Sequence, residues 1–180
     1  AGKLARILSC SNVYISKNNL IQNLRTGQES TIIIGTAVNS IDVKYKGEDS
    51  VIFAMANLRN KYNINNIKYQ VAGPGTGKYL RSLAKKLNLT ENIEFIGTKD
   101  KFQIMNWMKT INIYIQPSKQ EGLPRALIEA MSVGCYCLGS NIAGLPELLK
   151  QELMFNPGKV NQIEEKILIY MNSQTSEITK

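Results

Sequence analysis

The sequence predicts an α/β fold with a parallel sheet of about six strands and helices on both faces of the sheet. Three observations lead to this prediction. From residue 31 onward, short apolar runs alternate with longer amphipathic segments, a pattern that indicates right-handed βαβ units. The runs are continuously apolar, as in strands that are covered on both faces. Several of them end at glycine, where the chain can turn sharply into the next helix.

The first half of the pattern contains three pairs of a strand followed by a helix. Residues 31–35 read Thr-Ile-Ile-Ile-Gly, a run of β-branched side chains that favours a strand. In the segment that follows, Val51, Met55 and Leu58 recur at helical spacing on one side. The strand and helix ranges in this half are 31–35 with 49–62, 68–72 with 79–87, and 93–96 with 102–109.

The second half repeats the pattern, with ranges 111–116 and 123–133, 135–138 and 145–150, and 153–155 and 163–171. Six strands in this alternation predict a doubly wound, Rossmann-like sheet, which binds ligands at the carboxyl ends of its strands. We therefore expect one crevice to be surrounded by the loops after Gly35, Gly73, Gly97, Pro117 and Ser140.

Residues 1–30 do not fit this repeat. A strand at 13–16 and a helix at 17–24 are conceivable, and the chain starts at Ala1 rather than at an initiator Met. We expect a fragment of a longer protein, in which residues 1–30 are the end of a preceding domain or a linker and residues 31–180 form one domain. The competing interpretation is a complete protein that has been renumbered.

The composition is that of a soluble globular protein, with 43% apolar and 20% charged residues. No apolar run is long enough to span a membrane and no signal peptide opens the chain, so we expect a cytoplasmic protein. The formal net charge of +8 favours anionic partners. Because the basic residues are dispersed along the sequence, a nucleic-acid-binding domain is disfavoured.

The chain has no histidine and only three cysteines, without a CxxC pair. A zinc site would therefore lack ligands, and no Ser-His or Cys-His catalytic pair can exist. We expect no metal and no cofactor, and chemistry that uses carboxylates, lysine, arginine or backbone dipoles. Cys135 and Cys137 alternate in an expected strand, so buried packing is their simplest role.

Residues 72–79, Ala-Gly-Pro-Gly-Thr-Gly-Lys-Tyr, superficially resemble a phosphate-binding P-loop between a strand and a helix. That motif consists of a glycine, four further residues and then Gly-Lys-Ser/Thr. Here Ala72 stands at the first position and Tyr79 replaces the hydroxyl that would bind Mg²⁺. We therefore reject an ATPase or GTPase and expect only a glycine-rich turn.

The most informative segment is residues 116–131, with a strand end, a Pro-Ser turn, Glu121-Gly122 in a loop and then a helix that carries Glu129. Gly122 permits close approach of the backbone to a ligand, and the amides at the helix start favour a negative group. Glu121 can accept hydrogen bonds from sugar hydroxyls. From the residues alone, Glu121 could equally suit the helix dipole, and Glu129 could be an exposed carboxylate.

The spacing of Glu121 and Glu129, within Pro-Ser-x-x-Glu-Gly-Leu-Pro-x-x-x-x-Glu-Ala-Met, resembles the E-x7-E signature of family 4 retaining glycosyltransferases. These enzymes have the two-domain GT-B fold. The resemblance covers the chain from about residue 31 onward. Four further stretches match family motifs in the same order: a Lys-Gly element at 44–47, a glycine turn at 71–75, the strand before the nucleobase loop at 93–97, and a Gly-x-Pro-Glu turn at 142–148.

This resemblance implies the C-terminal, donor-binding half of a GT-B enzyme that transfers a sugar from a nucleotide-diphosphate sugar. Glu121 then contacts the donor sugar as the catalytic carboxylate and Glu129 contacts the ribose, while Lys46 lies on the diphosphate. The other implied donor-binding positions are Gly122 and Leu123 through their amides, Ser118 in the Pro-Ser turn, and Thr98 and Lys99 near the base.

Two departures from the family pattern stand out. The family often has an arginine soon after the first strand, whereas residues 35–39 contain none; Lys44 is the candidate substitute. The acceptor-binding domain is also almost entirely missing, so we expect the fragment alone to be inactive.

In the whole enzyme we expect a glycan or lipid-linked acceptor, a role in surface polysaccharide biosynthesis, and peripheral contact with the inner face of the membrane. The alternatives are another GT-B enzyme, such as a sugar epimerase, and a non-catalytic nucleotide-sugar-binding module.

Overall fold

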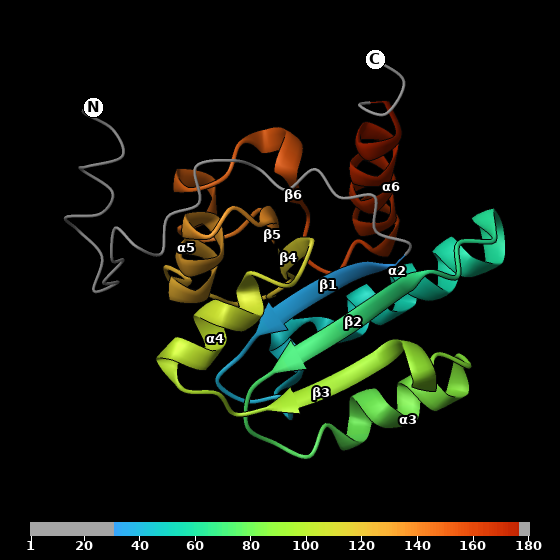
Figure 1. Ribbon diagram of the computed structural model, residues 1–180, viewed down its shortest axis with the longest axis horizontal. Helices are drawn as coiled ribbons and strands as arrows, with labels where there is room; N and C mark the ends of the chain where they lie inside the picture. The colour runs from blue at the N-terminus through green and yellow to red at the C-terminus, as the bar shows by residue number, and fades with distance from the viewer. Residues whose placement is uncertain (1–30, 177–180) are drawn as a thin grey trace.

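A parallel sheet of six strands forms the centre of the structure, a computed structural model that describes residues 31–176 (Figure 1). The strands are β1 (Ile32–Ala37), β2 (Ile67–Ala72), β3 (Ile93–Gly97), β4 (Ile113–Gln116), β5 (Tyr136–Ser140) and β6 (Met154–Phe155). They lie in the order β3-β2-β1-β4-β5-β6, and each neighbouring pair is parallel. Because the strand order reverses between β1 and β4, a crevice opens at the carboxyl ends of these two strands.

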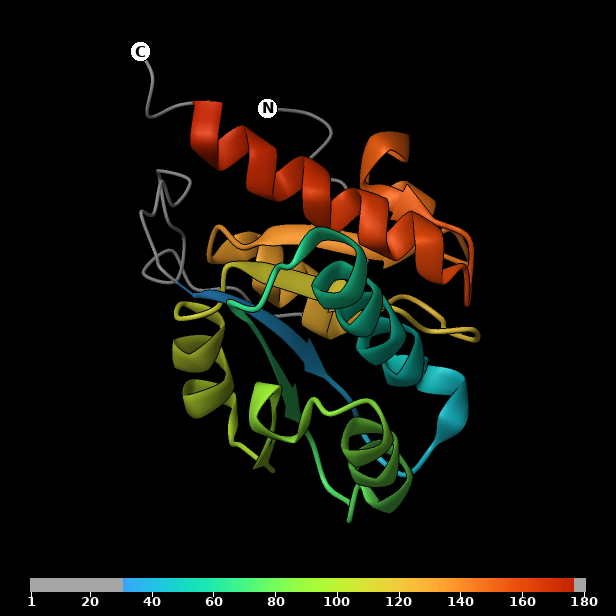
Figure 2. The same cartoon turned by 90° about the vertical axis from the view of Figure 1, so that its right-hand side faces the viewer.

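Helices cover both faces of the sheet (Figure 2). One face carries α2 (Glu48–Tyr62), α3 (Lys78–Lys86) and α6 (Val160–Ser176), and the other carries α4 (Lys101–Met108) and α5 (Arg125–Ser132). Short 3-10 turns are η2 (Lys44–Lys46), η3 (Thr90–Asn92), η4 (Leu145–Glu147) and η5 (Gln151–Leu153). Each helical layer has its own core: Leu58 and Ile163 are completely buried on one side, and Met108 and Leu127 on the other. Full burial of such a side chain contributes roughly 1.5–3 kcal/mol.

The predicted α/β class, the parallel sheet and its six strands are confirmed, and the differences lie at element ends. The strand predicted from residue 111 begins at Ile113, because the Asn112 side chain takes part in the pairing: its Oδ1 accepts from Ile33 N at 2.7 Å. The helix predicted from residue 123 begins at Arg125, since Pro124 has extended backbone angles and caps the helix. The strand predicted at 153–155 is limited to Met154–Phe155.

The helix predicted at 145–150 is wrong; only the single 3-10 turn η4 forms there. Leu145 and Leu149 instead pack toward β5, where Gly139 leaves room for them. A Cβ atom on Gly139 would lie 2.5 Å from Leu145 Cδ2 and 2.9 Å from Leu149 Cδ1. The segment is therefore shaped by its two buried leucines rather than by helix propagation, which is unfavourable for so short a stretch.

Three predictions fall on residues 1–30: the conceivable strand and helix there, and the assignment of this segment to a preceding domain. These residues, with Cys10, lie outside the part of the chain that the structure describes. The predicted burial of Cys135 and Cys137 is confirmed, since both thiols are buried beside β5 and α4.

Candidate functional site

A cavity of about 560 Å³ lies at the carboxyl ends of β1 and β4, where the strand order reverses. Segments far apart in the sequence meet there: the end of β1, the glycine turn after β2, the loop between β3 and α4, and the loop and helix after β4. The polar and charged side chains that line it are Asn39, Lys46, Thr98, Lys99, Lys101, Gln116, Glu121, Arg125 and Glu129. The predicted crevice is therefore present, at the place that the sheet topology favours. The loop after Ser140, which was predicted to border it as well, contributes no lining residue.

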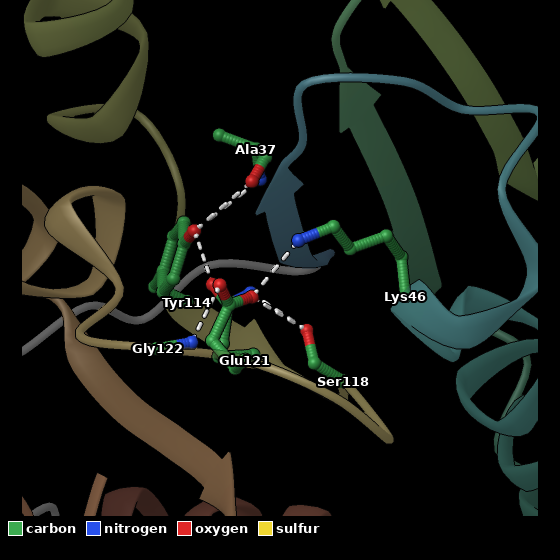
Figure 3. A network of polar contacts seen from close by, with 7 residues as sticks. Ala37, Lys46, Tyr114, Ser118, Glu121 and Gly122 are labelled. Atoms are coloured by element: carbon green, nitrogen blue, oxygen red, sulfur yellow. Dashed lines mark hydrogen bonds and ion pairs between the residues drawn. The ribbon is translucent and has the colours of Figure 1, made fainter. Parts of the chain in front are cut away.

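Glu121 is held at the floor of this cavity by three donors (Figure 3). Its Oε2 atom accepts from Lys46 Nζ at 3.0 Å, from Ser118 Oγ at 3.0 Å and from Gln116 Nε2 at 3.1 Å. Among the residues that the structure describes, its Oε1 atom has only the long contact of 3.4 Å with Gly122 N. Oε1 therefore keeps most of its capacity to accept hydrogen bonds from a bound molecule.

The approach of Lys46 to Glu121 depends on Gly47. This glycine has φ 80°, and a Cβ atom there would lie 2.1 Å from the carbonyl oxygen of Pro117. Only glycine allows η2 to sit so close to the loop after β4. A hydrogen bond of 2.7 Å from Lys119 N to Tyr45 O joins the same two segments. As a result, Lys46 is buried and its ammonium group forms an ion pair with Glu121.

A second layer of polar groups stands behind Glu121. Gln116 Nε2 donates to Ser118 Oγ at 3.0 Å as well as to Glu121, and Gln116 Oε1 accepts from the Tyr114 hydroxyl at 2.9 Å. The Tyr114 hydroxyl in turn lies 3.4 Å from Ala37 N at the end of β1. Sequence reasoning missed Tyr114 and Gln116. The available signal was their period-two spacing with Ser118, which places all three on one side at the end of β4.

The opposite side of the cavity is formed by α4 and α5. Glu129 is half-buried there, and this burial raises its pKa, while the positive charges of Lys101 and Arg125 oppose the shift. Lys101 and Arg125 are exposed and line the cavity. Neither side chain was singled out from the sequence, because only the packing of α4 beside α5 brings them together. The side therefore combines one carboxylate with two cations that remain close to solvent.

The predicted site residues separate into three groups. Lys46, Glu121, Glu129, Thr98, Lys99 and Leu123 all line the cavity. Ser118 is fully buried behind Glu121, and Gly122 follows Glu121 in the exposed loop. Lys44 lies apart: it is exposed, and its Nζ is 4.6 Å from the centre of the Tyr79 ring, beside a second, much smaller hollow. The donor-binding roles of all these residues stay predictions.

The glycine-rich turn after β2 is occupied by a carboxylate of the same chain. Asp42 accepts from Thr76 N and Gly77 N, each at 2.9 Å, and from the Thr76 hydroxyl at 3.0 Å. The backbone hydrogen bond from Thr76 is the main cause of the lowered pKa of Asp42. Amides that would hold a phosphate in a P-loop are thus already paired with Asp42, in agreement with the rejection of that motif.

Two kinds of feature are absent from residues 31–176. No three His, Cys, Asp or Glu side chains in this part of the chain lie close enough together to hold a metal ion. No helix in the same part is both long and apolar enough to cross a membrane. A reaction without metal or cofactor therefore stays a prediction from the sequence.

Residues 27–178 match the model of the family described as glycosyl transferases group 1. Protein CapJ of Staphylococcus aureus is 35% identical over 131 residues, which cover 72% of this chain and 33% of CapJ. The capsular polysaccharide biosynthesis glycosyltransferase CapH of the same species is 28% identical over 156 residues, or 76% of this chain and 43% of CapH. The chain thus spans less than half the length of either relative.

Solved structures resemble the described domain in fold. Sucrose-phosphate synthase from Thermosynechococcus elongatus has a TM-score of 0.71 at 21% identity, over 82% of this chain and 38% of that protein. Anabaena Alr3699/HepE, solved in complex with UDP, has a TM-score of 0.70 at 18% identity, over 79% of this chain and 40% of that protein. At these identities the likeness shows the fold alone.

Proposed function

Because the chain belongs to the family of group 1 glycosyl transferases, we propose that it is the donor-binding half of a retaining hexosyltransferase of the GT-B fold. In this proposal the cavity binds a nucleotide-diphosphate sugar, and the sugar passes with retention to a glycan or lipid-linked acceptor. The kinship with CapH, which is named for capsular polysaccharide biosynthesis, supports a role in making surface polysaccharide. The UDP complex of the HepE neighbour supports a nucleotide ligand.

The observation that carries the proposal is the Lys46–Glu121 pair inside the cavity. The two side chains are only 10% and 16% exposed, and their charged atoms are 3.0 Å apart. Removing two charges from water is costly, and such a pair is weak evidence for a stabilising role. Its position in a cavity at the switch point of the sheet favours a role in binding a polar, charged ligand.

The charge of the cavity suits a diphosphate. Four cationic side chains line it, Lys46, Lys99, Lys101 and Arg125, and two carboxylates, Glu121 and Glu129. The lining therefore has a formal surplus of two positive charges, 4 − 2 = 2. The diphosphate of a nucleotide sugar carries one negative charge on each phosphate, so the two are complementary.

Each side chain has a role in this proposal. Glu121 accepts hydrogen bonds from donor-sugar hydroxyls through Oε1, and Glu129 binds the ribose. Lys46 contacts the diphosphate, with the amides of Gly122 and Leu123 nearby. Ser118 holds Glu121 in place. Thr98 and Lys99, in the loop between β3 and α4, lie near the base.

The proposed reaction breaks the bond between the anomeric carbon and the diphosphate oxygen. The acceptor hydroxyl attacks the same face, its oxygen forms the new bond to that carbon, and its proton passes to the departing diphosphate. This route needs no histidine base, and the chain has no histidine. Stabilisation of the departing negative charge by Lys46 and the cavity cations is then the main contribution of the protein.

The acceptor site belongs, in this proposal, to an N-terminal domain of the full-length protein, with residues 1–30 at its end. The fragment alone then binds donor without turnover. The surplus of eight positive charges supports a cytoplasmic enzyme that associates peripherally with the anionic inner leaflet. Flotation of the full-length protein with anionic vesicles at low salt tests this; no binding under those conditions would exclude it.

Titration calorimetry of the 180-residue chain with UDP, GDP and their sugar derivatives tests the donor site. We expect binding of at least one series, and weaker binding in Lys46→Met. A chain that is folded but binds no member at millimolar concentration would overturn the proposal. Turnover by the full-length protein distinguishes a transferase from a sugar epimerase or a binding module.

A further inference from the structure

We propose that Gln116 is a positioning residue that decides which oxygen of Glu121 faces the donor sugar, and that the Tyr114 hydroxyl fixes the orientation of the Gln116 amide. This inference rests on the proposed function, because it takes Glu121 as the group that binds the sugar.

The Gln116 side chain is buried, with 3% exposure, and all of its polar groups are used. An amide nitrogen has two N–H donors. One donates to Glu121 Oε2 at 3.1 Å and the other to Ser118 Oγ at 3.0 Å, while Oε1 accepts from Tyr114 at 2.9 Å. A reversed amide would set its oxygen against the Glu121 carboxylate and its nitrogen against the Tyr114 donor.

Tyr114 gives this chain of hydrogen bonds a direction. Its hydroxyl oxygen lies 2.9 Å from Gln116 Oε1 and 3.5 Å from the Ala37 carbonyl oxygen, so its single proton goes to the nearer acceptor, Gln116. The same oxygen accepts from Ala37 N at 3.4 Å. Complete burial raises the pKa of Tyr114 far above its ordinary value, so the phenol stays protonated and remains a donor. Figure 3 shows Tyr114 between the end of β1 at Ala37 and the carboxylate of Glu121. Every link therefore donates toward Glu121, an arrangement in which successive bonds strengthen one another.

The consequence concerns the two oxygens of Glu121. Oε2 receives three donors, from Lys46, Gln116 and Ser118, which leaves it little capacity for a ligand. Oε1 is left for the sugar. Without the Gln116 donor, Oε2 keeps only the two donors Lys46 and Ser118, and we expect the carboxylate to rotate more easily away from the position that suits a sugar hydroxyl.

This role predicts that a substitution of Gln116 weakens the contribution of the donor sugar to binding and leaves the contribution of the nucleoside diphosphate unchanged. Gln116→Leu removes the amide at similar volume. Calorimetry of the 180-residue chain compares UDP with UDP-N-acetylglucosamine, and GDP with GDP-mannose. For the pair that binds, we expect the affinity of the sugar nucleotide relative to the nucleoside diphosphate to fall about tenfold, as for one lost hydrogen bond to a charged group. The affinity for the nucleoside diphosphate itself should stay within about twofold.

Tyr114→Phe is the second variant, since it removes only a hydroxyl and keeps the packing of β4. In this variant the affinity of the sugar nucleotide relative to the nucleoside diphosphate should fall about threefold, because the Gln116 amide keeps its donors but loses the partner that orients it. Tyr114→Phe decides the question if Gln116→Leu does not fold.

The outcomes are distinct. If the wild-type chain binds none of the four nucleotides, the proposed function is overturned and the positioning role with it. If the wild type binds, but the variants weaken both members of a pair equally or change neither, the donor site stands and the positioning role is overturned. A merely structural role predicts the equal loss.

Discussion

The two sides of the cavity hold their charges in different ways. The inner wall, from η2, β4 and the loop after β4, carries Lys46, Gln116, Ser118 and Glu121, which are joined by hydrogen bonds of 3.0–3.1 Å. The outer wall, from α4, α5 and the loop before α4, carries Lys99, Lys101, Arg125 and Glu129. On the outer wall, Lys101 and Arg125 are exposed, and both act on Glu129 through their charge.

This difference has a functional meaning. Buried groups that are joined to one another by hydrogen bonds keep one geometry, so the inner wall suits precise recognition of sugar hydroxyls. Exposed charges attract an oppositely charged ligand before it makes contact, and salt weakens this attraction. The outer wall therefore suits capture of an anionic ligand. Substitutions on the inner wall should therefore have large effects on turnover and ligand affinity that do not depend on salt. Substitutions on the outer wall should have small effects on ligand affinity that salt weakens.

The largest effect is expected from Glu121→Gln in the full-length enzyme. The amide keeps the volume and can still accept from Lys46, but it lacks the charge and the acceptor strength of the carboxylate. Turnover should fall several hundredfold in a variant that remains folded, the magnitude typical of one lost electrostatic contact to a reacting group. Glu165→Gln, on the exposed side of α6, removes the same charge and should leave turnover intact. Unchanged turnover in Glu121→Gln would remove this residue from the site.

The second largest effect is on stability, through the inner-wall ion pair. Lys46→Met leaves Glu121 buried without its cation, and loss of one partner of such a pair costs about 3 kcal/mol. The double variant Lys46→Met, Glu121→Gln should recover more than half of this loss, since no unpaired charge remains. Urea denaturation of the wild type, the two single variants and the double variant gives the four free energies of unfolding of this double-mutant cycle. Strict additivity would mean that the two charges do not interact appreciably.

Glu48 lies beside the inner wall, at the start of α2. It is 2% exposed, and its Oε1 has no hydrogen-bond partner within the described part of the chain. Burial raises the pKa of Glu48 from 4.5 to about 7, with the negative charge of Asp49 adding to the shift and the positive charge of Lys46 opposing it. Between these pH values the unfolded chain releases a proton that the folded chain retains. The free energy of unfolding therefore falls as pH rises from about 4.5 to 7.

Glu48→Gln should remove this pH dependence. At pH 8 the variant is expected to be more stable than the wild type by roughly 2–3 kcal/mol. At pH 4 this difference should vanish, because Glu48 of the wild type is then mostly protonated in both the folded and the unfolded chain. Urea denaturation at both pH values measures it. Glu165→Gln again serves as the control, and a gain that is equal at pH 4 and pH 8 would show that ionisation of Glu48 is not the cause.

The contrast between the two walls also explains what the sequence could predict. Continuous apolar runs specified the strands, and the position of Glu121 after a strand identified the inner wall. Both Lys44 and Lys46 were predicted to bind the donor, and that only Lys46 lines the cavity could not be foreseen, because this depends on the left-handed backbone of Gly47 and its contact with Pro117. Tertiary contact decides this, whereas sequence spacing does not.

The outer wall was the harder part to predict. Lys101 stands near the start of α4 and Arg125 at the start of α5, and each looks like an ordinary solvated cation in the sequence. Their role as cavity lining follows only from the packing of these two helices on the same face of the sheet. Gln116 and Tyr114 were missed for a related reason, since their partners on β1 and in the loop after β4 are defined by strand order.

The smallest effect is expected on the outer wall, from Arg125→Gln. Loss of this exposed cation should weaken binding of the nucleoside diphosphate about fivefold at 20 mM salt, where the Debye length is roughly 20 Å, and less than twofold at 0.5 M salt, because salt screens exposed charges. Lys46→Met should instead lose a similar fraction of affinity at both salt concentrations. Lys85→Gln, on the exposed side of α3 away from the cavity, removes one positive charge and should change binding little. Calorimetry at the two salt concentrations makes the comparison. If Arg125→Gln and Lys85→Gln weakened binding equally, Arg125 would act only through the overall charge of the protein. If the loss of affinity in Arg125→Gln did not depend on salt, Arg125 would contact the ligand directly, as the inner-wall residues are proposed to do.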